Sequence, residues 1–458
     1  MNKYYKHFLK EADRVSNDLK HRKTIKFNMS KYDAAVANGK LRYQQIEKAK
    51  EFVAYRKREA LKNLDEYLLK FEKNITSQGA IVHWAVDANE AGRLVNQIIK
   101  ENNGKLVVKS KSMTTEEIEF NHTVEANNIE SVETDLGEYI VQVAGEKPYH
   151  IVTPAMHKSK KDINELFHRE FNVGEDLTAE ELTNFVRVKL RKLYQEAEIG
   201  VTDANFIVAD IGGIAVTENE GNAIFSTGFP KVHIVIAGIE KVIPSLTDLG
   251  RCWPVLSSHG TGQAVTVYNS VFTGPKKNEE DFGPEKMYVI LLDNKRTELI
   301  NQPEQSDSLA CIRCGACLNA CPVYRNIGGY TYEATYGGPI GSVLSPHYQG
   351  FMQSAHLSYA CSICGKCTEV CPAKIDLHTL LLHNRNQDVE QHNKNFMFSN
   401  AMKAYKFAAL RPWAFDFGLN GIKNLFLKTL GKNAFSEHRS LPPLKKSFRK
   451  TYKKSIKE

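Results

Sequence analysis

The sequence lacks long hydrophobic runs. Its longest apolar stretches, such as VHIVIAGI and MYVILL, are far shorter than the ~20 residues that a helix needs to cross a bilayer. The opening residues, MNKYYKHFLKEADRVSNDLK, contain neither the apolar core nor the small-residue cleavage site of a secretory signal. Together these absences predict a cytoplasmic protein.

Nucleotide-binding fingerprints are also missing. The chain has no Walker A motif, and its Gly212-Gly213 pair stands outside any G-x-G-x-x-G pattern. The segment 257–262, SSHGTG, fits either an anion-binding loop or a simple turn. A bound NAD or FAD is therefore not supported.

A net positive charge is lacking outside the C-terminal end. The 458 residues carry a net charge of +8, but residues 401–458 hold 14 Lys/Arg against 3 Asp/Glu, so the first 400 residues sum to −3. Nucleic-acid binding across the body is not expected. The region 381–458 is predicted as a helical, basic tail. Peripheral membrane contact, docking of an acidic partner and simple wrapping around the protein's own body all fit it.

Nine cysteines are present, and eight of them form a motif written twice, C-x-x-C-x-x-C-x-x-x-C-P. Three close thiolates suit one [4Fe–4S] cubane, and the fourth cysteine, expected on the first turn of the following helix, usually reaches across to the other cluster. Two clusters are therefore predicted, one held by Cys311, Cys314, Cys317 and Cys371, the other by Cys361, Cys364, Cys367 and Cys321.

Two other uses of these cysteines are disfavoured. Structural zinc typically uses separated C-x-x-C pairs or Cys/His mixtures, and disulfide scaffolds are small and secreted. The ninth cysteine, Cys252, stands apart from all other ligand types and is predicted to be a small buried hydrophobe.

Periodicity predicts the rest of the fold. Residues 1–72 are predicted as a charged helical arm packed on the body, and 73–300 as an α/β domain with a largely parallel sheet. Capping boxes at Asp87/Glu90 and Thr178/Glu181 mark two helix starts. Expected strands lie at 81–86, 105–110, 206–217, 223–227 and 232–239.

The two cysteine blocks define a mainly helical, ferredoxin-type module at 301–380. The segment between them, 322–360, contains six tyrosines and six glycines. The glycines permit tight backbone, and the tyrosines are expected to pack against the clusters and to donate hydrogen bonds that tune their potential.

One acidic turn stands out in the α/β domain. Glu218 and Glu220, in the segment ENEGN, follow an expected strand, and ligands bind at the carboxyl ends of strands in open α/β sheets. A catalytic base or covalent carboxylate would be sited there. A solvated hairpin between two strands fits equally well.

Several segments together resemble the lactate utilization protein B family of the LutABC system. They are KSKSMTTEEIEFN, the run from Ile140 to Met156, ENEGN, DNKRTEL, CIRCGACLNACPVYR and YGGPIGSVLSP. The resemblance implies a LUD domain, similar to the sugar-phosphate isomerase (NagB/RpiA) and CoA-transferase group, with two [4Fe–4S] clusters matched at all eight cysteines. Glu218 and Glu220 match that group's catalytic ENG turn only loosely, so catalysis is not carried over.

The resemblance also implies a function. The protein is expected to be an electron-transfer subunit in oxidation of L-lactate to pyruvate, working with LutA-like and LutC-like subunits. Two alternatives stay open: a subunit for another 2-hydroxy acid such as glycolate or a heterodisulfide-reductase-like relay, and a LUD domain with its own acyl or phosphate chemistry.

Overall fold

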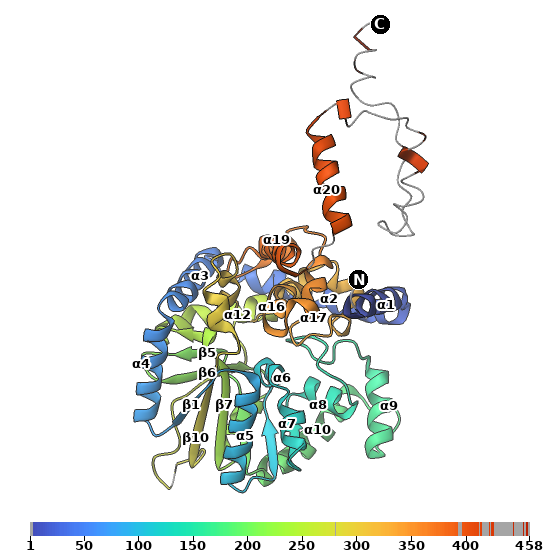
Figure 1. The fold of residues 1–458 in the computed structure, drawn as a ribbon. Helices are drawn as coiled ribbons and strands as arrows, with labels where there is room; N and C mark the ends of the chain where they lie inside the picture. Colours follow the sequence, from blue (N-terminus) through green and yellow to red (C-terminus); the bar gives the residue numbers. More distant parts are fainter. Residues whose placement is uncertain are drawn as a thin grey trace. The chain divides into compact units, whose positions relative to one another are not determined.

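The computed structural model describes residues 3–279, 281–392, 396–411, 413–414, 421, 423–425, 443, 452 and 455–456. By internal contacts the chain forms two compact units, Met1–Asp388 and Val389–Glu458. The first unit contains both sheets and both cysteine blocks (Figure 1).

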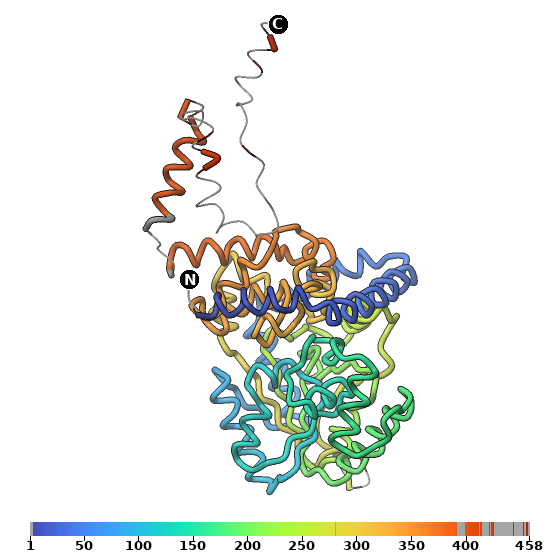
Figure 2. The backbone as a smooth tube through the Cα atoms, turned by 90° about the vertical axis from the view of Figure 1, so that its right-hand side faces the viewer, coloured from blue at the N-terminus to red at the C-terminus, as the bar shows by residue number. Residues whose placement is uncertain are grey.

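The N-terminal part of the first unit is helical, as expected. It forms α1 (Lys3–Asn17), α2 (Leu19–Leu41), α3 (Ile46–Lys62) and α4 (Leu64–Ser77). The side chain of Asp18 caps α2 by accepting the N–H of His21 at 2.9 Å. In Figure 2 the dark-blue helices run across the orange helices of the cysteine blocks, and α1 packs on α15 and α17.

A six-stranded sheet forms the centre of the α/β region, which we define as residues 81–292. All five pairings are parallel, in the order β1-β10-β7-β4-β2-β3, which confirms the largely parallel sheet. Its central strands β7 and β10 are almost entirely buried, as continuous apolar runs covered on both faces must be. The strands are β1 (Ile81–Ala85), β2 (Leu106–Lys109), β3 (Glu130–Glu133), β4 (Ile199–Thr202), β7 (Val232–Gly238) and β10 (Lys286–Leu292).

A second sheet of four strands lies beside the first, in the order β8-β5-β6-β9. Strand β6 pairs antiparallel with both β5 and β9, whereas β5 and β8 are parallel. The strands are β5 (Phe206–Val208), β6 (Gly213–Glu218), β8 (Val242–Ile243) and β9 (Tyr268–Phe272). The expected strand at 206–217 is thus two strands joined by a turn.

Two local predictions were wrong. Residues 223–227 form part of helix α11 (Asn222–Gly228), because Glu218 caps this segment and five residues of mixed polarity do not specify a strand. The ENEGN turn therefore joins a strand to a helix and is no hairpin. Residues 257–260 end helix α12 (Leu249–Gly260), where the Ser257 hydroxyl donates back to the carbonyl of Trp253 at 2.8 Å.

Helices cover both faces of the parallel sheet. Both predicted helix starts are present: Asp87 accepts the N–H of Glu90, and Thr178 and Glu181 form a reciprocal capping box. The covering helices are α5 (Ala88–Glu101), α6 (Met113–Glu117), α7 (Phe120–Glu125), α8 (Leu136–Val143), α9 (Lys160–Phe171) and α10 (Ala179–Glu196).

The cysteine blocks lie in a helical region after β10, which we call the cysteine module, residues 306–387. It is orange in Figure 1 and lies over the α/β region in Figure 2. Its helices, after α13 (Arg296–Ile300), are α14 (Ala316–Ala320), α15 (Tyr324–Ile327), α16 (Gly338–Gln349), α17 (Phe351–Tyr359), α18 (Lys366–Val370) and α19 (Leu377–Gln387). Five short 3-10 or π turns complete the described elements, η1 (Ile239–Lys241), η2 (Leu246–Asp248), η3 (Ser306–Ala310), η4 (Tyr330–Tyr332) and η5 (Asp388–His392).

The second unit begins at Val389 and is described mainly over α20 (Phe396–Ala409). Most of the predicted basic tail, including LPPLKKSFRKTYKKSIKE, lies outside the described residues. Across the part of the chain that is described, no helix combines the length and apolarity needed to span a membrane.

Candidate functional site

The two cysteine blocks fold into loops with the same backbone. In the first cysteine loop, Cys311–Cys321, left-handed conformations occur at Arg313 (φ 58°) and Gly315 (φ 78°). In the second cysteine loop, Cys361–Cys371, they occur at the matching positions, with φ 54° and 74°. These bends turn successive thiols of one loop inward, since an extended chain would carry them apart.

The fourth cysteine of each block ends a short helix. Cys321 directly follows α14 and Cys371 directly follows α18, each as the C-cap residue, and each precedes a proline. The expectation that the fourth cysteine lies on the first turn of the following helix was wrong. Because α14 and α18 pack against each other, each fourth cysteine is directed toward the other loop.

The structure brings Cys371 to the first loop. Its thiol interacts electrostatically with those of Cys311, Cys314 and Cys317, and all four cysteines line one narrow cavity. Burial raises the pKa of Cys371 to about 11, so its thiolate becomes favourable only when a metal compensates the charge.

Cys321 lies correspondingly with the second loop. Its thiol interacts with those of Cys361 and Cys364, and Cys367 interacts with all three. Burial raises the pKa of Cys367 to about 12. Cys364 is exposed, whereas its counterpart Cys314 is buried.

These two sets of four thiols fit iron–sulfur cubanes. Within the described residues, no three Cys, His, Asp or Glu side chains are arranged to hold a single metal ion. Four converging thiols are the donor set of a [4Fe–4S] cluster, whose irons take one thiolate each. Cys252, by contrast, lies apart with 1% exposure, and burial raises the pKa of its thiol to about 12.

Backbone N–H groups point at four of the sulfurs. Cys311 Sγ accepts from Arg313 at 3.4 Å, and Cys361 Sγ accepts from Ile363 at 3.3 Å. The fourth cysteines, Cys321 and Cys371, accept from backbone N–H groups three and four residues later, at 3.5 and 3.4 Å. Such bonds stabilise added negative charge on a cluster.

The tyrosines of the 322–360 segment behave partly as expected. Tyr324 and Tyr332 are buried in the same hydrophobic core as the cysteines. Two hydroxyls of the segment bond elsewhere: Tyr336 donates to Glu117 at 2.7 Å, and Tyr324 donates to the carbonyl of Tyr149 at 2.9 Å. Tyr324 instead donates its backbone N–H to Cys321 Sγ at 3.5 Å.

A polar cavity of ≈ 370 Å³ separates the α/β region from the first cysteine loop; we call it the junction cavity. The residues that follow four parallel strands line it, as the carboxyl edge of such a sheet predicts. They are Lys111 after β2, Asp135 after β3, Asp203 after β4 and Lys241 after β7. Cys311, Arg313 and Cys314 line the same cavity from the cysteine module.

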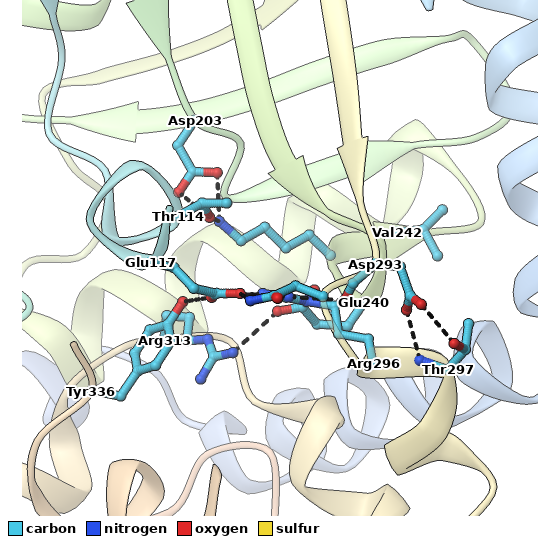
Figure 3. Close-up of polar contacts among 12 residues, drawn as sticks. Thr114, Glu117, Asp203, Glu240, Val242, Asp293, Arg296, Thr297, Arg313 and Tyr336 are labelled. Carbon is cyan, nitrogen blue, oxygen red and sulfur yellow. Dashed lines mark hydrogen bonds and ion pairs between the residues drawn. The ribbon is translucent and has the colours of Figure 1, made fainter. Parts of the chain in front are cut away.

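A buried ion network joins the two regions beside this cavity (Figure 3). Glu240, 1% exposed, contacts the guanidinium of Arg296 and accepts from Arg313 Nη2 at 3.1 Å. Arg296 also pairs with Glu117 at 2.8 Å, and Tyr336 donates to that carboxylate. Burial alone would raise the pKa of Glu240, but Arg296 and then Arg313 hold it well below its usual range.

Two lysines extend the network. Lys57 is 1% exposed, and its ammonium donates to the backbone carbonyls of Glu240 and Val242. Burial lowers the pKa of Lys57 to about 8. Lys241 pairs with Asp203 at 2.5 Å.

Glu218 and Glu220 both line the junction cavity. Glu218 accepts the N–H groups of Ala223 and Ile224 at 2.6 and 3.0 Å, which occupies both of its oxygens at the start of α11. Glu220 accepts the N–H of Leu136 at 2.9 Å. Although Glu220 contacts solvent at the cavity mouth, burial and then the charge of Asp135 raise the pKa of its carboxyl to about 7.

Sequence reasoning missed most of the cavity's charged residues. Lys57, Lys241 and Asp203 of the lining, and Glu240 of the adjacent ion network, lie in unremarkable local sequence and meet only through the fold. Arg313 could have been singled out from the sequence, because it lies inside the first cysteine motif (C-I-R-C) at the position where the second motif has Ile363.

Comparisons with known proteins agree with this architecture. Residues 68–292 match the LUD domain, and residues 307–375 match the 4Fe-4S dicluster domain. A solved DUF162 family protein from Deinococcus radiodurans is 12% identical, covers 50% of this chain and 98% of its own, and has a TM-score of 0.28, too low to support an argument.

Full-length relatives are much more similar. Lactate utilization protein B of Geobacillus thermodenitrificans is 41% identical over 79% of this chain and 76% of its own length. Those of Bacillus pumilus and Bacillus subtilis are 39% and 40% identical, covering 90% and 81% of this chain and 89% and 80% of theirs. The chain has a LUD domain with an α/β sheet followed by a 4Fe–4S dicluster domain, and it belongs to the lactate utilization protein B family.

Proposed function

We propose that the protein carries electrons during oxidation of L-lactate to pyruvate, through two [4Fe–4S] clusters with exchanged ligands. Cys311, Cys314, Cys317 and Cys371 would hold the first cluster, and Cys361, Cys364, Cys367 and Cys321 the second. The observation that carries this proposal is the position of each fourth cysteine, which lies with the three thiols of the other loop. Such clusters exchange single electrons at potentials set by ligation, hydrogen bonding and exposure.

The two sets of thiols differ in their exposure to solvent. In the first set, Cys314, Cys317 and Cys371 are buried and Cys311 is partly buried. The second set reaches the surface at the exposed Cys364. Since electron transfer between proteins requires close approach, we place the exchange with a LutA-like or LutC-like partner at the second loop.

The finer features of the fold and setting belong to the same proposal. We infer that the α/β region shares the lineage of the sugar-phosphate isomerase and CoA-transferase group, because its acidic turn, after β6 of the second sheet, lines the cavity at the carboxyl edge of the parallel sheet. We also infer domain limits near residues 72, 300 and 380, and a cytoplasmic location where thiols stay reduced.

The test is reconstitution with the partner subunits. Anaerobically purified protein should contain about eight irons per chain, as two cubanes require. L-Lactate added to the reconstituted complex should bleach the broad cluster absorbance, and glycolate should do so much less. Reduction by glycolate but not by L-lactate would contradict the lactate assignment, and an iron content near four would contradict two clusters.

A further inference from the structure

The junction cavity has the features of a ligand site that the electron-carrier role alone does not require. It is concave, reaches ≈ 370 Å³, and is lined by convergent charged and hydroxyl side chains. It lies at the carboxyl edge of the parallel sheet, where open α/β sheets bind ligands. We propose that this cavity binds a small 2-hydroxy or 2-oxo acid through its carboxylate, directly beside the first cysteine loop.

Arg313 supplies the first reason to expect an anion. Its side chain is 12% exposed and stacks on the ring of Tyr336, with 4.4 Å between guanidinium and ring centroid. One nitrogen, Nη2, donates to Glu240. The other two, Nε and Nη1, are buried without a hydrogen-bond partner among the described residues. Unpaired buried donors on a cation are costly unless a ligand accepts them.

The cations of the lining give the second reason. Four of them, Lys57, Lys111, Lys241 and Arg313, face the cavity together with the carboxyl groups of Asp135, Asp203, Glu218 and Glu220, and the oxygens of Glu218 already accept N–H groups of α11. Among the described residues, the ammonium of Lys57 donates to backbone carbonyls and to no carboxylate. A carboxylate ligand would complete this set.

Lys111 adds a cation elsewhere in the lining. Its ammonium donates to the carbonyl of Val152 at 2.5 Å and lies 4.0 Å from Asp135, too far for a strong bond. Of its three N–H groups, at least one remains for a ligand.

The remaining lining suits a second oxygen on the ligand. Glu218, Glu220 and Asp135 contribute carboxyl groups, and Asn205 and Thr217 contribute an amide and a hydroxyl. The raised pKa of Glu220, caused by burial and by Asp135, allows this carboxyl to accept a hydroxyl proton or to donate one to a carbonyl. A carboxylate with an adjacent oxygen therefore matches both parts of the cavity.

Binding here would place the acid against the first cysteine loop, because Cys311 and Cys314 form part of the cavity wall. The choice of a three-carbon acid as probe rests on the proposed function. The site itself rests only on the cavity and its charges.

The experiment measures binding to the full-length, cluster-loaded protein by anaerobic calorimetry. The probes are L-lactate, pyruvate and propane-1,2-diol, which lacks the carboxylate. We expect either acid to bind at least about 10-fold more tightly than the diol, as loss of a charge-assisted bond predicts. Equal binding of acid and diol, or no binding of either acid, would overturn the proposal.

Variants locate the binding. Lys111→Gln and Arg313→Gln should each weaken acid binding about 10-fold or more, whereas Lys192→Gln, on the exposed face of α10, should not change it. Unchanged binding in both cavity variants would overturn the site. Iron content is measured in each variant. If Arg313→Gln loses iron, the test of the binding site rests on Lys111→Gln, because Lys111 lies outside the cysteine loops.

The two proposals fail separately. Lactate-dependent cluster reduction without acid binding to this chain would reject the junction-cavity site and leave the electron-carrier role. Acid binding without cluster reduction in the reconstituted complex would reject the electron-carrier role and leave the site.

Discussion

The two cysteine loops have the same backbone and different surroundings. Both bend through left-handed residues at matching positions, and both direct a backbone N–H at their first sulfur. The first loop places Arg313 at its bend, inside a buried ion network that reaches the α/β sheet. The second places Ile363 there and exposes Cys364. A duplicated motif thus gives one enclosed site beside a cavity and one site open to solvent.

The largest expected effect comes from exchanging the fourth ligands. Cys371→Ser should remove the cluster of the first loop, and Cys321→Ser that of the second, because each serine replaces the thiolate from the other block. Each variant should keep about four of the eight irons. Iron analysis and the electron paramagnetic resonance of the remaining cluster measure this.

Cys252→Ala is the matched control, since Cys252 lies apart from both sets and the variant should retain all iron. If Cys371→Ser instead removes the second cluster, the fourth cysteines bind the clusters of their own loops, and the predicted exchange of ligands is contradicted.

Removing one charge should cost much more stability in the buried ion network beside the first loop than in an exposed ion pair of the second loop. Arg296→Met leaves Glu117 and Glu240 without their shared cation and should lower the free energy of unfolding by about 3–5 kcal/mol. Lys366→Met, which breaks an exposed pair with Glu369 in the second loop, should cost about 0–1 kcal/mol.

Anaerobic urea unfolding at constant iron content gives both values. Similar losses in the two variants would show that the buried network does not anchor the first loop.

Arg313 should make the first cluster easier to reduce than Ile363 makes the second. At an effective dielectric constant of ~20, a nearby guanidinium stabilises one added electron by on the order of 2 kcal/mol. Arg313→Gln should therefore lower the first cluster's potential by roughly 50–100 mV, since ~59 mV corresponds to a tenfold change for one electron. Redox titration followed by electron paramagnetic resonance measures the shift.

Ile363→Arg is the reciprocal variant. It should raise the second cluster's potential by less, because solvent near the exposed Cys364 screens the new charge. A larger shift there than at the first loop would contradict the assigned difference in enclosure.

The smallest effect concerns Glu220 at the mouth of the junction cavity. Its pKa is raised to about 7, so the folded state holds this proton more tightly than the unfolded state does. Between pH ~4.5 and ~7 this group therefore makes stability fall as pH rises. Glu220→Gln should remove this pH-dependent fall in the free energy of unfolding. The fall should be less than about 1 kcal/mol, because the carboxyl contacts solvent.

Unfolding at pH 5 and pH 8 measures the difference, with Glu196→Gln on the exposed α10 as control. A steeper decline in Glu220→Gln than in the unaltered protein would reverse the sign and reject the raised pKa.

Much of the fold was predictable because its signals are local. The capping side chains of Asp87 and Thr178 bond to N–H groups within three residues, so their helix starts could be read directly. The segment 223–227 could not, because a cap supplied by Glu218 from the preceding strand decides that it is helical.

The sequence by itself determined the α/β sheet and the dicluster region, because repeated spacing and hydrophobic periodicity act over a few residues. The family followed from the resemblance of whole segments to known relatives. The tertiary structure alone decided that Lys57, Glu240, Arg296 and Arg313 meet beside the first cysteine loop. Contacts between residues far apart in the chain have no local signature, since they arise only when α3, β7, α13 and the first loop pack together. Because of that packing, the first of two similar cysteine loops lines the junction cavity.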